Sequence, residues 1–404
     1  MSVVIGIIIG ILMLMFLVTA HEFGHFIAAR RNGVEVEEFG ICFPPRAMAW
    51  RKVNGKWRRL KKKEWKKPPG KGTIISLNWL PIGGFCQMKG ESDADTEVGS
   101  FGASNFWQKT KILFGGVAMN WLVAFVLLTI LAWIGMPHFL EGQFKMENDT
   151  RVLVETPVTI GEVMTDSPAN RAGLRNGDIV RKARVTGENA ERANIATTQD
   201  LLDFNNRHAG NVVYFTCERD GKETVVEVKL NEAGAEYLLG AGISGNVYYR
   251  SSWSAPIVGF MTTAQITGET FKGVGMLLYN LVSGVVQQVN PNQEVRENGA
   301  AAIKSAGDSV SGPVGIIGVL FPAFVASGLN NLAFLVALIS ISLACMNVLP
   351  IPALDGGRWL LIAIYRLRKK KLTKETEEKI VGRAFMVILA LAAIVTVIDI
   401  MRLF

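Results

Sequence analysis

The sequence predicts a multi-pass α-helical membrane protein with four transmembrane helices, a membrane-associated β-hairpin region and a β-rich domain outside the cytoplasm. Three observations support this prediction: long stretches without charge, basic residues gathered in short loops, and a change to alternating, strand-like sequence after residue 150. Of the 404 residues, 49% are hydrophobic and only 19% are charged, whereas soluble domains carry about 25% charged residues. No nucleic-acid partner is expected, because the net charge of +8 is clustered in the loops.

Apolar stretches define the helical part of the chain, since a membrane span takes about 20 such residues. We expect transmembrane helices within residues 1–30, 107–136, 329–365 and 382–404. The first stretch contains Val18-Thr19-Ala20, which resembles a signal-peptide cleavage site. It lacks the basic residues that precede a signal sequence, so we expect the stretch to be retained as a helix.

The remaining segments differ in character. Residues 31–106 are expected to form a basic loop and a membrane-associated β region. Residues 251–328 are moderately apolar and are expected to form interfacial, amphipathic helices, although a linker with amphipathic packing fits their first part equally well.

Basic residues set the expected orientation. Ten Lys and Arg residues lie between Arg46 and Lys71, against the single acid Glu64, and the loop before the fourth helix is similarly basic. Short basic loops stay in the cytoplasm. We therefore expect a protein of the cell membrane with cytoplasmic basic loops, and with both termini and the β-rich domain on the other side.

His21-Glu22-Phe23-Gly24-His25 forms an HExxH motif at the end of the first apolar stretch. On a helix, residues four apart share a face, so both imidazoles can reach one zinc ion while Glu22 lies beside the attacking water. Ionisable side chains at membrane depth are costly and usually functional. The motif therefore predicts a metal site.

A catalytic zinc site needs a third protein ligand and one open position. Asp355 is the best candidate, because it follows the third apolar stretch just after Pro350 and Pro352 have ended the helix. The first and third spans run in the same direction, so His21 and Asp355 should reach a similar depth. The same ligands can bind Co(II) or Mn(II), and zinc is preferred.

Four segments together resemble the site-2 protease family of intramembrane zinc metalloproteases, in particular its bacterial regulator-of-sigma-E (RseP-like) branch. These are HEFGH, the segment NVLPIPALDG at Asn347–Gly356, the hairpin-like Thr73–Glu91 and the SGPVG element at Ser311–Gly315. Gly115–Asn120 resembles the GPxxN element of the family, with Val117 in place of the usual proline.

The resemblance implies a metalloendopeptidase of site-2 type that cleaves single-span membrane proteins in the lipid bilayer, such as anti-sigma factors or signal-peptide remnants. It implies Zn²⁺ as cofactor, with His21, His25 and Asp355 as ligands and Glu22 as general base. Substrate contacts are expected from Asn347, Asn120, Gly83 and Gly84, although an amide such as Asn347 could instead only bridge helices.

Ser167–Val180 resembles the SPAxxAGLxxGDxI element of PDZ domains, and we expect a PDZ domain at residues 151–232 with a helix over Thr198–His208. Such domains bind extended peptides by adding a strand to a sheet edge. A shielding domain without a peptide ligand is the alternative. The sequence contains one such element, where enterobacterial members of the family have two domains.

Two other functions fit part of the sequence. A PDZ-bearing membrane binding protein or chaperone could carry a non-catalytic metal, although a structural zinc site normally has four protein ligands. A transporter could also use intramembrane carboxylates, but no internal repeat is visible in the sequence.

Overall fold

The computed structural model describes residues 3–65, 69, 72–140, 142–154, 157–186, 190–235, 237–245, 247–308 and 312–403. The chain divides into two compact units. Unit 1 comprises Met1–Ile130 and Gly259–Phe404, and unit 2 comprises Leu131–Val258.

The prediction of a membrane protein with four apolar helices is confirmed. In the described part of the chain, the helices long and apolar enough to cross a bilayer are α1 (Val3–Arg31), α2 (Phe106–Ile134), α9 (Leu329–Val348) and α11 (Lys374–Leu403). Within the segment 329–365, α9 ends before the two prolines and α10 (Asp355–Leu367) begins after them. Helix α11 starts at Lys374, before the boundary expected at 382.

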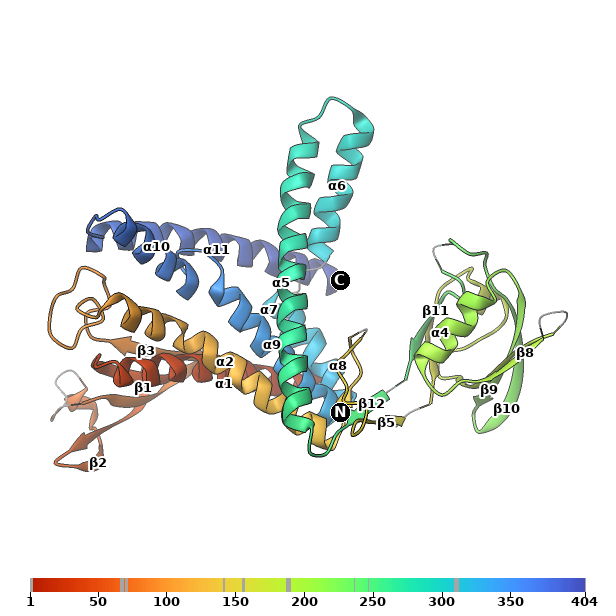
Figure 1. The fold of residues 1–404 in the computed structure, drawn as a ribbon, viewed down its shortest axis with the longest axis horizontal. Coiled ribbons are helices and arrows are strands. Elements are labelled where there is room, and N and C mark those ends of the chain that lie inside the picture. The colour runs from red at the N-terminus through yellow and green to blue at the C-terminus, as the bar shows by residue number, and fades with distance from the viewer. Residues whose placement is uncertain are drawn as a thin grey trace. The chain divides into compact units, whose positions relative to one another are not determined.

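The β region of unit 1 is an antiparallel sheet in the order β2-β1-β3 (Figure 1). Its strands are β1 (Val36–Val53), β2 (Lys56–Arg59) and β3 (Ile74–Met88), with the short helix η1 (Lys62–Glu64) between β2 and β3. Both long strands fold back, so that Ile41 pairs with Leu77 on one side and with Gly84 on the other. The last segment of β3, Gly84–Met88, is therefore one edge of the sheet, and β2 is the other.

A short helical segment packs on the N-terminal half of α1. It consists of α7 (Pro313–Gly315), the π-helical η2 (Ile316–Leu320) and α8 (Phe321–Ala326), while Ser311 lies outside the described residues. The contact is close, because a Cβ atom at Gly6 would lie 2.5 Å from Cα of Pro322.

Two buried carboxylates hold α11 at its ends. Near its start, Glu377 accepts hydrogen bonds from the backbone N–H of Asp93 (2.9 Å) and from Nε of Arg358 (3.2 Å). Near its end, Asp399 accepts from the backbone N–H groups of Gly312 (3.3 Å) and Gly315 (2.8 Å). Only 6% of the apolar window between these ends is buried.

Helices α5 (Ala255–Gln288) and α6 (Gln293–Asp308) form an antiparallel pair (Figure 1). Their backbones meet at Gly284 and Gly299, since a Cβ atom at Gly299 would lie 2.8 Å from the Gly284 oxygen. Residues 255–288 form one continuous helix, which excludes the linker alternative for this segment.

Unit 2 contains a six-stranded antiparallel sheet with the order β10-β9-β7-β6-β11 and with β8 paired to β7. Its strands are β6 (Thr159–Val163), β7 (Ile179–Val185), β8 (Glu191–Asn194), β9 (Val212–Arg219), β10 (Lys222–Lys229) and β11 (Ala241–Ser244). The helices are α3 (Pro168–Arg171) and α4 (Thr198–Arg207). Because β11 pairs with β6, the sheet extends past the boundary expected at 232.

A second, three-stranded sheet of unit 2 has the order β4-β12-β5. It is formed by β4 (Met136–Pro137), β5 (Arg151–Val154) and β12 (Val247–Arg250). The first strand of the segment expected as the PDZ domain, β5, therefore belongs to this sheet and not to the six-stranded one.

Candidate metal centre

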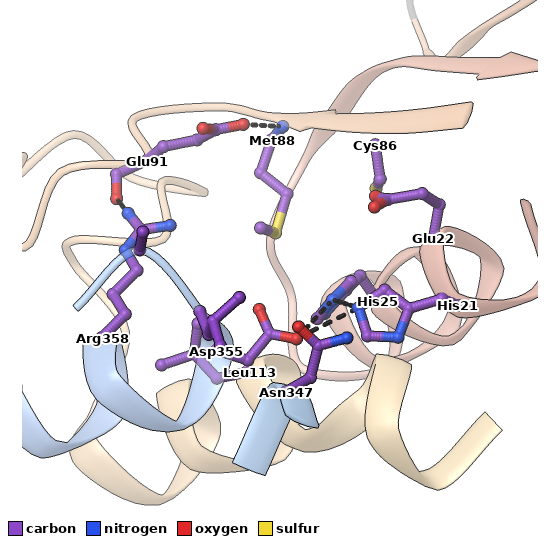
Figure 2. A pocket seen from close by; sticks show the side chains of 12 residues that line it. His21, Glu22, His25, Cys86, Met88, Glu91, Leu113, Asn347, Asp355 and Arg358 are labelled. Atoms are coloured by element: carbon purple, nitrogen blue, oxygen red, sulfur yellow. Dashed lines mark hydrogen bonds and ion pairs between the residues drawn. The ribbon is translucent and has the colours of Figure 1, made fainter. Parts of the chain in front are cut away.

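The structure brings His21, His25 and Asp355 together, although more than 300 residues separate the histidines from the aspartate (Figure 2). The Nε2 atoms of the two histidines are 3.1 Å apart. Oδ2 of Asp355 lies 3.1 Å from Nε2 of His21 and 3.4 Å from Nε2 of His25. The three atoms form a nearly equilateral triangle.

This triangle fits one zinc ion. Tetrahedral zinc with ligand bonds near 2.0 Å places neighbouring ligand atoms about 3.3 Å apart, close to each of the three observed distances. Oδ2 of Asp355 is buried and has no hydrogen-bond donor among the described residues, so a metal ion is a suitable partner for it. Two imidazoles and one carboxylate are a typical donor set of catalytic zinc sites, which leave the fourth position open.

Each ligand is positioned by a specific local structure. His21 and His25 lie one turn apart on α1. Asp355 is the first residue of α10, and the glycines that follow it let the backbone fold tightly over the proline loop. A Cβ atom at Gly356 would lie 2.1 Å from the oxygen of Val348, and one at Gly357 would lie 2.0 Å from that of Ile351.

The distal nitrogen atoms of both histidines face α2. Nδ1–H of His25 donates to the carbonyl oxygen of Ile112 (2.8 Å), which leaves Nε2 unprotonated for a metal. Nδ1 of His21 lies 3.4 Å from the side-chain amide of Asn120. The Asn120 side chain is fully buried, and its Oδ1 atom has no partner among the described residues.

Glycines on α2 make room for the ligands. A Cβ atom at Gly116 would lie 2.6 Å from Nε2 of His25 and 2.5 Å from Cε1 of His21. The neighbouring residue Gly115 contacts Gly24 of α1. A Cβ atom added at Gly24 would lie only 2.2 Å from the backbone oxygen of Gly115. The two helices therefore cross in backbone contact next to the histidines.

A cavity of about 280 Å³ opens over the triad (Figure 2). Glu22 points into it beside Cys86 of the sheet edge, and its carboxylate interacts with the Cys86 backbone. Asn347, at the end of α9, lines the cavity next to Asp355. A substrate in this cavity can therefore reach the triad, Glu22 and the sheet edge together.

Three expected substrate-binding residues have other surroundings. Asn120 does not line the cavity; its side chain contacts Nδ1 of His21, the ring nitrogen that does not take part in the triad. Gly83 and Gly84 also lie outside the cavity lining and face α1, where Cβ atoms would meet Val18 at 2.8 Å and Thr19 at 3.2 Å. The structure thus gives these glycines a packing role between β3 and α1.

The cavity lining also contains an arginine that no sequence motif predicted. Arg358 lies one turn after Asp355 on α10, donates to the carbonyl oxygen of Glu91 and pairs with Glu377. The Glu91 side chain accepts from the backbone N–H of Met88 (2.9 Å). Residues three apart on a helix share a face, so the spacing of Asp355 and Arg358 could have predicted that Arg358 lies near the site. No sequence pattern could have predicted the contact of the Ile112 carbonyl group with His25.

A triad that fits one zinc ion, with an HExxH glutamate beside it on an apolar helix of spanning length, is characteristic of a membrane metalloprotease. The chain belongs to Peptidase family M50, whose family model matches residues 9–392. It is therefore a zinc metalloprotease of site-2 type.

Curated relatives agree with this assignment. A Clostridium perfringens protein whose name includes the words "zinc metalloprotease" is 29% identical over 397 residues, covering 98% of both chains. Zinc metalloprotease RasP of Geobacillus kaustophilus is 26% identical and covers 96% of both chains. Metalloprotease MmpA of Caulobacter vibrioides is 25% identical, covering 92% of this chain and 90% of its own.

Proposed function

We propose that this metalloprotease cleaves peptide bonds in or near the transmembrane segments of single-span membrane proteins. The main support is the position of the metal triad, whose ligand atoms lie within 4.8 Å of one another on α1 and at the start of α10, directly after α9. Both α1 and α9 are apolar enough to span a bilayer. Protein segments already in the membrane are therefore the nearest substrates.

His21, His25 and Asp355 are the proposed zinc ligands. When bound, zinc supplies a Lewis acid that polarises the scissile carbonyl group and lowers the pKa of water. Glu22 accepts the proton of the attacking water and returns it to the leaving amine. Its place in the cavity, beside the triad and against Cys86, supports this assignment.

A transmembrane substrate must first unwind locally, because its carbonyl groups are hydrogen-bonded within its own helix. Each freed backbone group needs a new partner in the dry site. The edge segment Gly84–Met88 lies beside Glu22 and pairs with no further strand among the described residues. We assign it to bind the opened substrate by strand addition, in exchange for the contacts that the Cys86 and Met88 backbones make with the side chains of Glu22 and Glu91. Asn347 supplies a further amide at the cavity wall.

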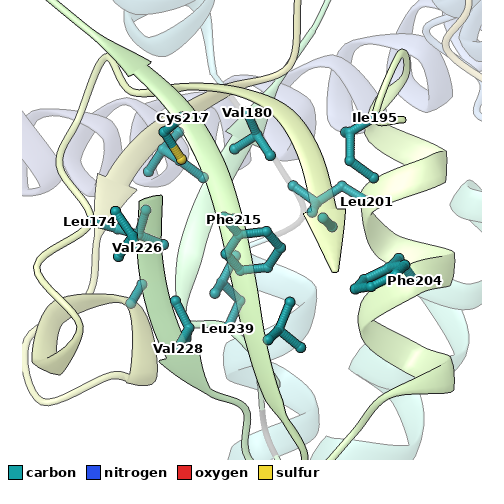
Figure 3. Close-up of a cluster of buried hydrophobic side chains, with 14 of the residues drawn as sticks. Leu174, Val180, Ile195, Leu201, Phe204, Phe215, Cys217, Val226, Val228 and Leu239 are labelled. Carbon is teal, nitrogen blue, oxygen red and sulfur yellow. The ribbon is translucent and has the colours of Figure 1, made fainter. Parts of the chain in front are cut away.

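We place the protein in the cell membrane, with the basic loops in the cytoplasm and both termini on the other side. Unit 2 then lies outside the cytoplasm as a PDZ-type domain that screens or binds substrates. Its core of buried side chains includes Phe204 of α4 and Phe215 of β9 (Figure 3). The Ser167 hydroxyl caps α3 within the SPAxxAGL segment by accepting from Asn170 N–H (3.1 Å).

The direct test is cleavage of a model single-span substrate, such as a signal-peptide remnant, by purified protein in detergent. Glu22→Gln should abolish cleavage and leave bound zinc unchanged, while Glu37→Gln, an exposed control, should leave both unchanged. Cleavage by the Glu22→Gln protein at the wild-type rate would refute the assigned role. Substrate binding without cleavage by the wild-type protein would favour the binding-protein function.

A further inference from the structure

A second cavity, of about 310 Å³, lies between α1 and α2 and shares no lining residue with the metal cavity. It exists because the helices cross in backbone contact at Gly24 and Gly115, and small side chains continue from this crossing along both helices. Ala28 of α1 and Ala118 of α2 are part of its lining.

The two ends of this cavity differ in chemistry. Arg31 and Lys111, the only charged lining residues, mark one end, where α1 finishes and α2 has just begun. Met119 and Leu122 line the other end, further along α2. The lining therefore changes from cationic to apolar along the helix axes.

Both cations are available for a ligand. Arg31 and Lys111 are exposed, and neither makes an ion pair or a hydrogen bond with another residue in the described part of the chain. Neighbouring basic residues are engaged differently: Lys109 pairs with Asp93, and Arg30 lies over the ring of Phe26. The cavity thus carries two positive charges without an internal counter-charge.

The length of the cavity matches one leaflet of a bilayer. Leu122 follows Lys111 by eleven residues on α2, a rise of about 16 Å, and one leaflet contributes about half of the 30 Å hydrocarbon core. A charged end and an apolar end separated by this distance match the headgroup and the acyl chains of a lipid.

We propose that this cavity binds one anionic phospholipid, with the headgroup phosphate between Arg31 and Lys111 and an acyl chain along Ala118 and Leu122. Basic pockets between transmembrane helices are suited to anionic headgroups, and a free phosphate ion would leave the apolar part unused. Because the crossing at Gly24 lies between the two histidines in sequence, the bound lipid also stabilises the packing of α2 against the helix that carries His21 and His25.

The experiment uses the full-length protein reconstituted in vesicles of equal parts phosphatidylglycerol and phosphatidylcholine, then transferred to detergent. Native mass spectrometry measures the phospholipid retained on each protein molecule. Wild-type protein should retain one phosphatidylglycerol in preference to phosphatidylcholine. The double variant Arg31→Gln/Lys111→Gln should bind it roughly 30-fold more weakly, the loss expected from two basic contacts.

Two matched variants make the result specific. Lys56→Gln/Arg59→Gln removes the same charge from exposed positions on β2 and should retain the lipid. Ala118→Phe keeps both charges, fills the apolar part at an exposed position and should lower retention. Equal losses in the two charge variants, equal retention of both lipids by the wild type, or displacement by millimolar glycerol phosphate would overturn the proposal.

Discussion

Nδ1 of His25 lies 2.8 Å from the carbonyl oxygen of Ile112, one turn before Gly116 on the same helix. Helix α2 therefore does two things for the metal site. Its carbonyl group fixes the tautomer of His25, and its glycine leaves the space in front of both imidazoles open.

Gly116→Ala should reduce zinc binding, because the added methyl group would lie 2.6 Å from Nε2 of His25. We expect affinity to fall at least about tenfold, as for other changes beside metal ligands. Zinc content after dialysis against a graded chelator measures this. Gly273→Ala, in a helical position with open space, is the control, and full zinc retention by Gly116→Ala would contradict the geometry.

Asn120 should act through His21. Turning its side-chain amide would place the unpartnered Oδ1 atom against Nδ1–H of His21. Asn120→Leu should weaken zinc binding about 10- to 100-fold, whereas Asn120→Asp keeps an acceptor and should retain most of it. Zinc dissociation constants of the two variants decide the matter. Equal loss in both would indicate a packing role only.

Asp399 should stabilise the packing of α7 against α11. Its carboxylate accepts from the backbone N–H groups of the buried Gly312 and the half-buried Gly315, and Asp399→Leu leaves both without this partner. We expect about 1–3 kcal/mol of destabilisation per lost partner, read as a lower unfolding temperature in detergent. Glu378→Gln, an exposed change on the same helix, serves as the reference. An unchanged unfolding temperature would show that these N–H groups find other partners.

Unit 2 should lose stability in acid through Asp178. The Arg219 guanidinium, 2.6 Å away, lowers the pKa of this carboxyl group below its usual value, and the Asp178 residue is 1% exposed. A carboxylate with a lowered pKa in the folded state stabilises the fold above the unfolded pKa, about 3.9. This contribution should be constant above about pH 5 and decrease as the pH falls through the lower folded value.

Hydrogen exchange of β9 amides in the full chain, corrected for the intrinsic pH dependence, measures this effect. Asp178→Asn should remove the acid-dependent part and lower protection at neutral pH, while Glu218→Gln, which breaks an exposed pair with Arg181, should change little. An unchanged acid profile in Asp178→Asn would assign the pH dependence to other groups.

The sequence predicted the parts of this protein that follow from composition and periodicity. Uncharged stretches located α1, α2, α9 and α11, because hydrocarbon excludes charge along a whole span. The HExxH spacing and the position of Asp355 after the proline break predicted the three residues that the fold brings together. Local sequence patterns were sufficient to predict features that depend on a single segment, such as a helix span or the spacing of two side chains on one helix.

Features that depend on distant partners were not predictable in this way. The fold-back of β1 and β3 places Gly84 next to Ile41 through pairings more than 40 residues apart. The role of Ile112 rests on a backbone carbonyl group, which any residue supplies. Asn120 contacts His21 and does not line the cavity, because of the way α2 is rotated about its own axis. A short sequence motif does not determine this rotation.

Glu377 and Asp399 attach helix α11 to the rest of the protein near its two ends, and few residues between them are buried. Its middle is therefore solvated by acyl chains, and only overall hydrophobicity constrains those positions. Random apolar replacements there should be tolerated as a group, so genetic drift among descendants of this chain should accumulate in the middle of α11 and spare the two acids that anchor it.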